Sequence, residues 1–178
     1  MSAAVIRPAR REDLSAVAAI YEALLDLEEQ GKGVTGWQRG VYPTYQTAEA
    51  ALQKGTLYVE TEETTGKILA AAKIDQEQVP EYAQAPWAYA AAAREVLVLH
   101  TLVVDPAAAG KGCGSRFVAF YEDLARSMGC TCLRMDTNEK NLPARRLYQK
   151  LGYREAGVVS CVFNDIPGVR LVCLEKKL

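Results

Sequence analysis

Three glycines at alternate positions, Gly110, Gly112 and Gly114, separate a strongly apolar segment from an amphipathic one. The segment before them, residues 95–104, is apolar on both faces, which is typical of a central strand. In the segment after them, residues 115–128, apolar residues recur at helical spacing. Glycine admits backbone conformations that other residues avoid, and the start of a helix carries unpaired N–H groups. The loop therefore predicts a strand-to-helix turn that can hold a phosphate or pyrophosphate.

The remaining segments alternate between strand-like and helix-like patterns. Strand patterns lie at residues 5–8, 57–60, 67–74, 132–136, 155–163 and 169–175. Helix patterns lie at residues 14–25, 47–54, 115–128 and 141–151, and loop-like composition at residues 31–47 and 80–93. This order predicts a single domain over residues 1–178, with an α/β or α+β fold and a mixed sheet.

Short-range signals mark where several of these elements begin and end. Asp13 is placed to cap the first helix, and Gly152 to end the last one just after its final turn. Residues 164–168, Asn-Asp-Ile-Pro-Gly, predict the turn of a terminal hairpin. The alanines in residues 67–74 fit a helix as well as a strand, so their pairing with residues 57–60 in a hairpin is an interpretation.

The charge balance limits the class of partner. The chain has 21 Lys and Arg against 22 Asp and Glu, a net charge of −1, and its pI is near 5.9. No basic stripe indicates a nucleic acid, so any phosphate-bearing ligand must be held locally. The first residues lack the apolar core of a signal peptide, and no segment approaches ~18 uninterrupted apolar residues. We therefore expect a soluble, cytoplasmic protein without a membrane partner.

Cysteine and histidine usage argues against a disulfide framework and a metal centre. The five cysteines are Cys113, Cys130, Cys132, Cys161 and Cys173. None of them forms a C-x-x-C pair, and the odd count suits reduced thiols in a cytoplasm. With His100 as the single histidine, a zinc site is not expected.

Two common phosphate-binding signatures fit the glycine loop poorly. A P-loop needs Ser or Thr after its Gly-Lys, but Lys111 is followed by Gly112. The dinucleotide fingerprint G-x-G-x-x-G begins correctly at Gly110, yet its third glycine would fall on Ser115. Asp136 lies roughly where a ribose-binding acid would be, so a dinucleotide site stays the weaker alternative.

A third pattern fits the loop better, because the chain resembles the GNAT superfamily of acyl-CoA-dependent N-acetyltransferases. The family's cofactor loop reads Arg or Gln, two residues, Gly, one residue, then Gly or Ala, and these positions are Ala109, Gly112 and Gly114 here. The preceding residues 102–106 look like the family's fourth strand and its exit. Ala109 departs from the usual Arg or Gln, so backbone donors, with Lys111 adding charge, would have to compensate.

A second hallmark of the family lies further along the chain. The pattern is Asn-x-x-Ala, then Leu-Tyr, then Leu-Gly followed by Phe or Tyr. It is matched in order and spacing by Asn141, Ala144, Leu147, Tyr148, Leu151, Gly152 and Tyr153. Residues 6–9 with Asp13 and Leu14 are also similar to family N-termini, so the resemblance reaches across residues 6–153.

The resemblance implies a fold, a reaction and a cofactor. The fold would be a mixed, mostly antiparallel central sheet flanked by helices and splayed between its fourth and fifth strands. The reaction would move an acetyl group from acetyl-CoA to a primary amine, with no metal, and a backbone N–H of residues 102–104 would bind the oxyanion. The implied cofactor-binding residues are Leu102, Val103, Val104, Ala109, Gly110, Lys111, Gly112, Cys113, Gly114, Ser115, Asn141, Ala144 and Tyr148.

The resemblance also implies catalytic roles. Tyr148 occupies the position of the family's usual general acid, which delivers a proton to the CoA sulfur, although its helix face also fits a packed core tyrosine. A base or a water relay must deprotonate the amine, and the strand pattern offers two candidates for the base: His100, which shares a strand face with Leu102, and Glu95 at the start of that strand. Both also have structural readings, as a core histidine and a solvated strand end. Cys113 has no evident histidine partner, which favours direct transfer in a ternary complex over an acyl-enzyme.

The acceptor is left open between a small-molecule amine and a peptide or protein amine. In this fold the acceptor groove is bordered by the region after the first helix and by the terminal hairpin. The residues offered there are Trp37, Tyr42, Tyr45 and residues 164–168, with Glu77 and Glu81 as acids that could attract a cation. A non-catalytic acyl-CoA sensor or partner domain is the alternative function, ahead of a dinucleotide-dependent oxidoreductase. A homodimer is one option for the assembly.

Overall fold

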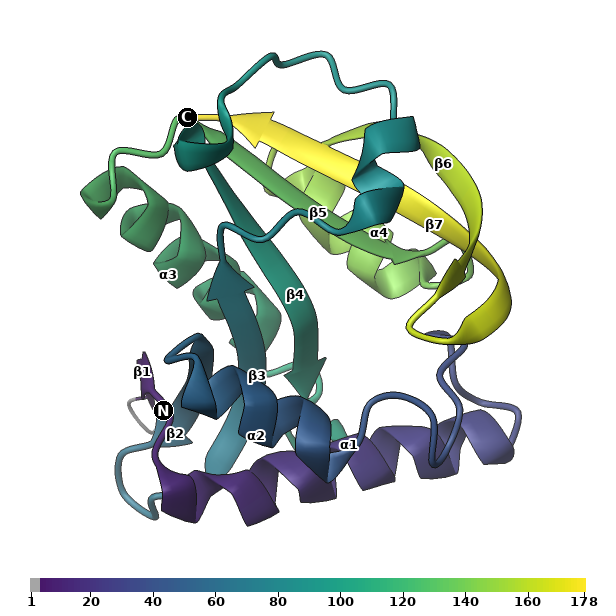
Figure 1. Cartoon of the computed structure of the whole chain (residues 1–178). Helices are drawn as coiled ribbons and strands as arrows, with labels where there is room; N and C mark the ends of the chain where they lie inside the picture. The colour runs from purple at the N-terminus through teal and green to yellow at the C-terminus, as the bar shows by residue number, and fades with distance from the viewer. Residues whose placement is uncertain (1–3) are drawn as a thin grey trace.

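A seven-stranded mixed sheet organises the computed structural model, which describes residues 4–178. The strands are β1 (Ala4–Pro8), β2 (Leu57–Glu62), β3 (Ile68–Asp75), β4 (Val96–Val104), β5 (Cys132–Asn138), β6 (Arg154–Phe163) and β7 (Ile166–Lys177). Their order is β1-β2-β3-β4-β5-β7-β6, and all neighbours run antiparallel except β4 and β5, which are parallel. The expected mixed, mostly antiparallel sheet is confirmed (Figure 1).

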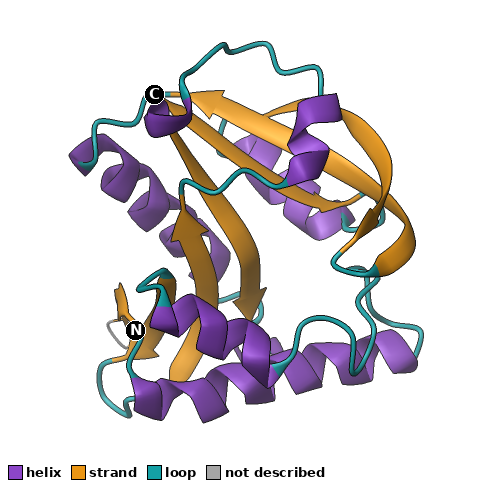
Figure 2. Cartoon of the chain, in the orientation of Figure 1, coloured by secondary structure: helices purple, strands orange, loops and turns teal. Residues whose placement is uncertain are grey.

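Helices cover both faces of this sheet (Figures 1 and 2). The helices are α1 (Leu14–Glu29), α2 (Tyr45–Gln53), α3 (Cys113–Ser127) and α4 (Leu142–Lys150), and the 3₁₀ turns are η1 (Arg11–Asp13), η2 (Pro80–Gln84), η3 (Ala93–Glu95) and η4 (Pro106–Ala108). One core cluster joins α1 and α2 to one face of the sheet, and another joins α3 and α4 to the opposite face. Within residues 4–178, no helix combines the length and apolar character needed to cross a membrane.

The alanine-rich segment that fitted either a helix or a strand is the strand β3. Ala71 packs in the cluster with α1, whereas Ala70 and Ala72 pack in the cluster with α3. All three are buried, as expected for a strand covered on both faces. Their small side chains allow helices to pack against both sides of the strand, so burial by tertiary structure overrides the helix propensity of alanine.

Two local details differ from the sequence expectation. Asp13 occupies the N-cap position of α1, as expected, but its side chain makes no capping hydrogen bond to the helix. Its carboxylate accepts the Arg10 N–H at 2.7 Å and pairs with Arg7 at 2.7 Å, which closes the η1 turn before the helix. The terminal hairpin turns at Asn164 and Asp165, with φ of 50° and 62°, because these residue types tolerate the left-handed conformation. The other three residues of the predicted turn already belong to β7.

The sheet opens between its two parallel strands. β4 and β5 are paired only from Val96 opposite Cys132 to Leu99 opposite Met135, although both strands continue beyond this point. Thr101, at a φ of 52°, lies where the register between β3 and β4 shifts. Beyond the last pair the strands diverge (Figure 1), which confirms the expected splay.

Candidate active site

A cavity of about 370 Å³ lies where β4 and β5 separate. The first residue after the last parallel pair on each strand, His100 on β4 and Asp136 on β5, lines this cavity. Tyr148 of α4 and the aromatic pair Trp37 and Tyr42 from the α1–α2 connection also line it. The splay thus brings together side chains from distant parts of the chain.

The glycine loop forms the predicted strand-to-helix turn. Gly110 and Gly112 have φ of 76° and 78°, so both use the left-handed conformation that glycine adopts without strain. Gly112 caps α3, and the helical ladder begins where Arg116 donates its N–H to the Gly112 carbonyl at 3.0 Å. The N–H groups of residues 112–115 precede that first bond and have no intrahelical acceptor. These amides and the helix dipole provide the environment that an anion needs.

Gly114 has a different role from the two glycines before it. A Cβ at this position would lie 2.9 Å from Leu147 Cδ2 of α4, so the missing side chain allows α3 and α4 to touch. On α4, Asn141 accepts the Ala144 N–H at 3.2 Å through its side chain and so caps the helix. The two motif segments of the sequence are therefore in direct contact.

An arginine supports the turn from the first part of α3. Arg116 donates through Nε to Glu60 Oε1 at 2.5 Å and through Nη1 to the Lys111 carbonyl at 2.7 Å. Glu60 lies on β2 and is fully buried, and its second carboxylate oxygen has no hydrogen-bond partner among residues 4–178. Ala109, in contrast, is exposed. Sequence reasoning missed this pair because 56 residues separate its members.

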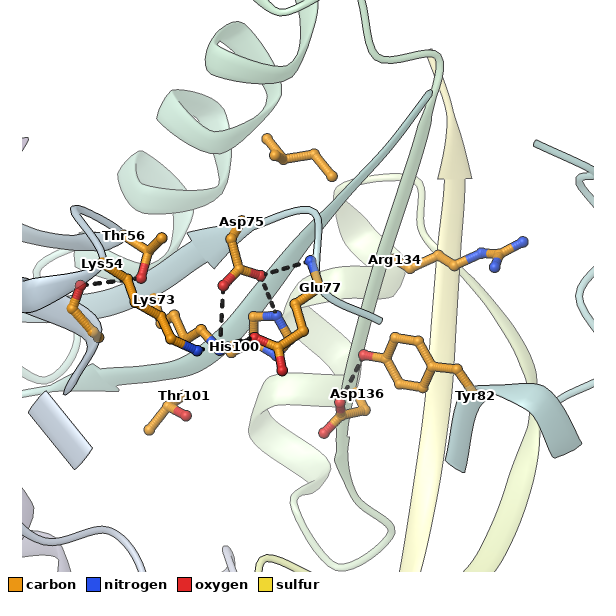
Figure 3. A network of polar contacts seen from close by, with 12 residues as sticks. Lys54, Thr56, Lys73, Asp75, Glu77, Tyr82, His100, Thr101, Arg134 and Asp136 are labelled. Carbon is orange, nitrogen blue, oxygen red and sulfur yellow. Dashed lines mark hydrogen bonds and ion pairs between the residues drawn. The ribbon is translucent and has the colours of Figure 1, made fainter. Parts of the chain in front are cut away.

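His100 is held by a carboxylate on the neighbouring strand. Its Nε2 lies 2.9 Å from Asp75 Oδ1, and Lys73 lies 3.2 Å from the other oxygen of Asp75 (Figure 3). Burial alone would raise the pKa of Asp75, but the hydrogen bond with His100 and the nearby positive charges outweigh it and lower the pKa. An ionised Asp75 accepts a hydrogen bond from the Nε2–H of His100. In a neutral imidazole this tautomer leaves Nδ1 as the proton acceptor.

Asp136, which sequence reasoning placed only in a dinucleotide site, forms a second polar pair with Tyr82 of η2, on the β7 side of β5. The Tyr82 hydroxyl donates to Asp136 Oδ2 at 2.7 Å (Figure 3). Burial raises the pKa of Asp136 to about 6, against the opposing effects of the Tyr82 hydrogen bond and of His100. A signal was available in the sequence, because Asp136 is the first acidic residue after the apolar part of the predicted fifth strand.

This raised pKa predicts a pH-dependent difference in stability between the wild type and Asp136→Asn. A folded-state pKa of about 6, above the ordinary 3.8, means that ionisation of Asp136 opposes folding. The stability contributed by its protonated carboxyl is therefore fully present below pH 3.8 and is lost as the pH rises through about 6. The variant can still accept the Tyr82 hydrogen bond but does not ionise. The Tm of the variant minus that of the wild type should therefore increase from pH 4 to 7. A difference that stays constant over this range would contradict the assignment.

Tyr148 is both a packed residue and a cavity residue. Its side chain is buried, its ring lies 6.1 Å from that of Tyr153, and it also lines the cavity. Burial raises the pKa of the Tyr148 hydroxyl, and the charge of Asp136 raises it further. The phenol therefore keeps its proton at neutral pH, as a proton donor must. The two interpretations of this tyrosine are compatible.

The other predicted site residues lie in several places. Leu102, Asn141 and Ala144 also line the cavity. Glu95 lies in η3 at the opposite end of β4, where its carboxylate accepts the Ala92 N–H at 2.8 Å, and the structure does not bring it to the cavity. Cys113 is buried beside the glycine turn, and burial raises the pKa of its thiol.

Some of the predicted acceptor residues line the cavity and others do not. Trp37, Tyr42, Glu77, Asn164 and Ile166 line the cavity. The remaining candidates, Tyr45, Glu81, Asp165, Pro167 and Gly168, are not among the lining residues of the described chain.

The open edge of β4 presents backbone donors to the splay. Asp105 donates its N–H to the Leu69 carbonyl on β3 at 2.8 Å. Because N–H groups alternate sides along an extended strand, those of Leu102 and Val104 point away from β3, toward the side where β5 has diverged.

Comparisons with known proteins agree with this geometry. Residues 17–153 match the profile of the acetyltransferase (GNAT) family. A relative described as an uncharacterized N-acetyltransferase of Bacillus subtilis (strain 168) is 27% identical over 150 residues, which cover 84% of this chain and 89% of the relative.

Solved structures share the fold at low sequence identity. A GNAT-family acetyltransferase from Streptococcus agalactiae has a TM-score of 0.79 at 21% identity, over 98% of this chain and 95% of that chain. A Salmonella typhimurium protein described as an acetyltransferase, solved with its cofactor acetyl-CoA, has a TM-score of 0.68 at 21% identity, over 99% and 94% of the two chains.

Proposed function

Because this chain belongs to the GNAT family of acetyltransferases, we propose that it transfers the acetyl group of acetyl-CoA directly to a primary amine. The observation that carries the proposal is the meeting of His100 and Tyr148 at one cavity, beside strand amides of β4 and next to the helix that touches the glycine turn. Release of free thiol from acetyl-CoA, measured across an amine library, tests it. Acetyl-CoA binding without turnover of any amine would instead favour a sensor.

The residues of the glycine turn fit the diphosphate of acetyl-CoA. The left-handed Gly110 and Gly112 need no side chain, and the N–H groups of residues 112–115 have no helical acceptor. These groups would hold the diphosphate at the start of α3, where the helix dipole favours negative charge. When bound, acetyl-CoA supplies an acetyl group activated as a thioester.

Three groups of this chain would act around the acyl carbon. His100 Nδ1 takes a proton from the acceptor, since an amine with a pKa near ~10.4 is mostly protonated at neutral pH. The N–H of Leu102 donates to the acyl oxygen from the open edge of β4. As the C–N bond forms and the C–S bond breaks, Tyr148 donates its hydroxyl proton to the departing sulfur, and the second proton that the nitrogen loses restores the phenol.

The placement of the cysteines supports direct transfer. Cys113 is buried and its thiol pKa is raised, so little reactive thiolate forms at neutral pH. No cysteine of residues 4–178 is among the cavity-lining residues. An acyl-enzyme intermediate therefore lacks a nucleophile at the site, which favours attack by the amine within a ternary complex.

Lys111→Ala tests whether a side-chain charge compensates for Ala109. Lys111 lies between the two left-handed glycines and is exposed. Its loss should weaken CoA binding roughly two- to fivefold, with a smaller effect at high salt, because the charge is screened there. Titration calorimetry with CoA measures the change. Lys150→Ala, an exposed lysine at the end of α4, is the matched control and should leave the affinity unchanged. An unchanged affinity in Lys111→Ala would assign the binding to backbone groups alone.

A further inference from the structure

We propose that the part of the cavity between β5, β7 and the α1–α2 connection is the acceptor subsite, and that it takes a primary ammonium attached to a compact apolar group. Asp136 would hold the ammonium, and the surrounding apolar wall would hold the rest of the molecule. The inference rests on the proposed function and adds to it the chemical class of the acceptor.

Asp136 is the carboxylate in the cavity that is available to a cation. The charged side chains lining the cavity, all within the described residues, are Lys54, Lys73, Glu77 and Asp136. Glu77 is already paired with Lys73 at 3.1 Å and with Lys54 at 3.7 Å. Among these four, Asp136 alone has no ion-pair partner in the described structure, and its contact is the neutral Tyr82 hydroxyl on one oxygen. A bound ammonium would supply the missing positive charge.

Apolar side chains surround this carboxylate. Tyr82 belongs to a core cluster with β7, and the members of that cluster that line the cavity are Trp37, Tyr42, Val79, Phe163, Ile166, Val169 and Leu171. The rings of Trp37 and Tyr42 meet edge to face at 5.9 Å. Such a wall gains free energy by burying hydrocarbon, and aromatic faces also tolerate a neighbouring cation.

The cavity is poorly suited to an acceptor that carries its own negative charge. Lys73 lies 3.2 Å from Asp75 and 3.1 Å from Glu77, and Lys54 is paired with Glu77. A phosphate or carboxylate on the acceptor would compete with Asp75 and Glu77 for these lysines, and it would share the cavity with the like charge of Asp136, which has no ion-pair partner among the described residues. The charge arrangement therefore favours amines without an anionic group.

The test compares amines that differ in one feature, using the full chain. The probes are 2-phenylethylamine, phenylalanine, which is the same molecule with an added carboxylate, and glucosamine 6-phosphate. We expect kcat/KM for 2-phenylethylamine to exceed the other two by at least tenfold. An equal or larger kcat/KM for either anionic amine would overturn the subsite, as would turnover of other amines but not of 2-phenylethylamine.

A second measurement is independent of turnover. N,N-dimethyl-2-phenylethylamine keeps the positive charge and the ring, but its neutral form has no N–H to lose after attack and cannot form a stable amide, so calorimetry reports its binding alone. Asp136→Asn should weaken this binding at least tenfold and raise the KM for 2-phenylethylamine more than it lowers kcat. Glu81→Gln, a nearby acid outside the cavity lining, is the control and should change neither by more than threefold. Equal binding by Asp136→Asn and wild type would overturn the inference.

These results separate the two proposals. If no amine is acetylated while acetyl-CoA binds, the proposed function fails, and the dimethyl amine titration still decides the subsite. If anionic amines are the better substrates, the proposed function stands and the subsite assignment fails.

Discussion

Replacing Tyr148 with phenylalanine should lower kcat by about 10²–10³-fold while the Kd for CoA stays within twofold of wild type. The ring still fills its buried position, so packing is kept. The change removes the hydroxyl that we propose as the general acid, and general acid catalysis typically contributes about 10²–10⁴-fold. Steady-state kinetics and calorimetry with CoA separate the two quantities.

Tyr153→Phe is the matched control for this prediction. The Tyr153 hydroxyl donates to Glu122 at 3.1 Å, and this residue does not line the cavity. Its loss should change kcat by less than threefold and cost about 1 kcal/mol of stability. If Tyr148→Phe kept the wild-type kcat, the phenol would have only a packing role, and another group would have to protonate the sulfur.

Arg116→Ala should lower the free energy of unfolding by about 3 kcal/mol, because it leaves the buried Glu60 carboxylate without its ion-pair partner. This value is near the lower end of the usual range, since Arg116 itself is 43% exposed. The same change removes the donor to the Lys111 carbonyl and should weaken CoA binding by about fivefold. Denaturant unfolding and calorimetry measure the two effects.

A second substitution separates the two effects of Arg116. Adding Glu60→Gln removes the unpaired charge, so the double variant should regain most of the lost stability while CoA binding stays weak. Arg126→Ala, on the same helix but with surface partners, should cost at most about 1 kcal/mol. If the double variant also regained wild-type CoA affinity, Arg116 would act on stability alone and would not position the turn.

Local patterns predicted most of the fold. The glycine turn, the central strand and both motif helices lie within a few residues of their expected bounds, because each depends on periodicity or on residues close in sequence. Gly152, at a φ of 89°, follows α4 as expected. The differences at Asp13 and in the terminal turn arise where a local signal fits two geometries. The Asp13 carboxylate pairs with Arg7, and the pairing of β6 with β7 extends to Ile166 and shortens the turn.

The polar contacts of the site could not be predicted in the same way. Tyr82 comes from a segment with loop-like composition and meets Asp136 across 54 positions of sequence. Glu60 and Arg116 meet across 56, and His100 and Asp75 across 25. Each of these pairs depends on strand order and register, which single-sequence periodicity does not specify. The motif resemblance located Tyr148 and the glycine turn, but not Arg116 and Glu60 beside that turn or the charge of Asp136 in the cavity.

The contact between Gly114 and Leu147 fixes α3, which follows the glycine turn, relative to α4, which carries Tyr148. Leu147 immediately precedes Tyr148, so the main chain of α3 at Gly114 packs against the residue next to Tyr148. In the proposed function, the distance from the diphosphate site to the Tyr148 hydroxyl would be set by two packed helices, with only the Leu147 side chain between their main chains. Under that proposal, a CoA diphosphate bound at the start of α3 would place the thioester relative to Tyr148 independently of the acceptor.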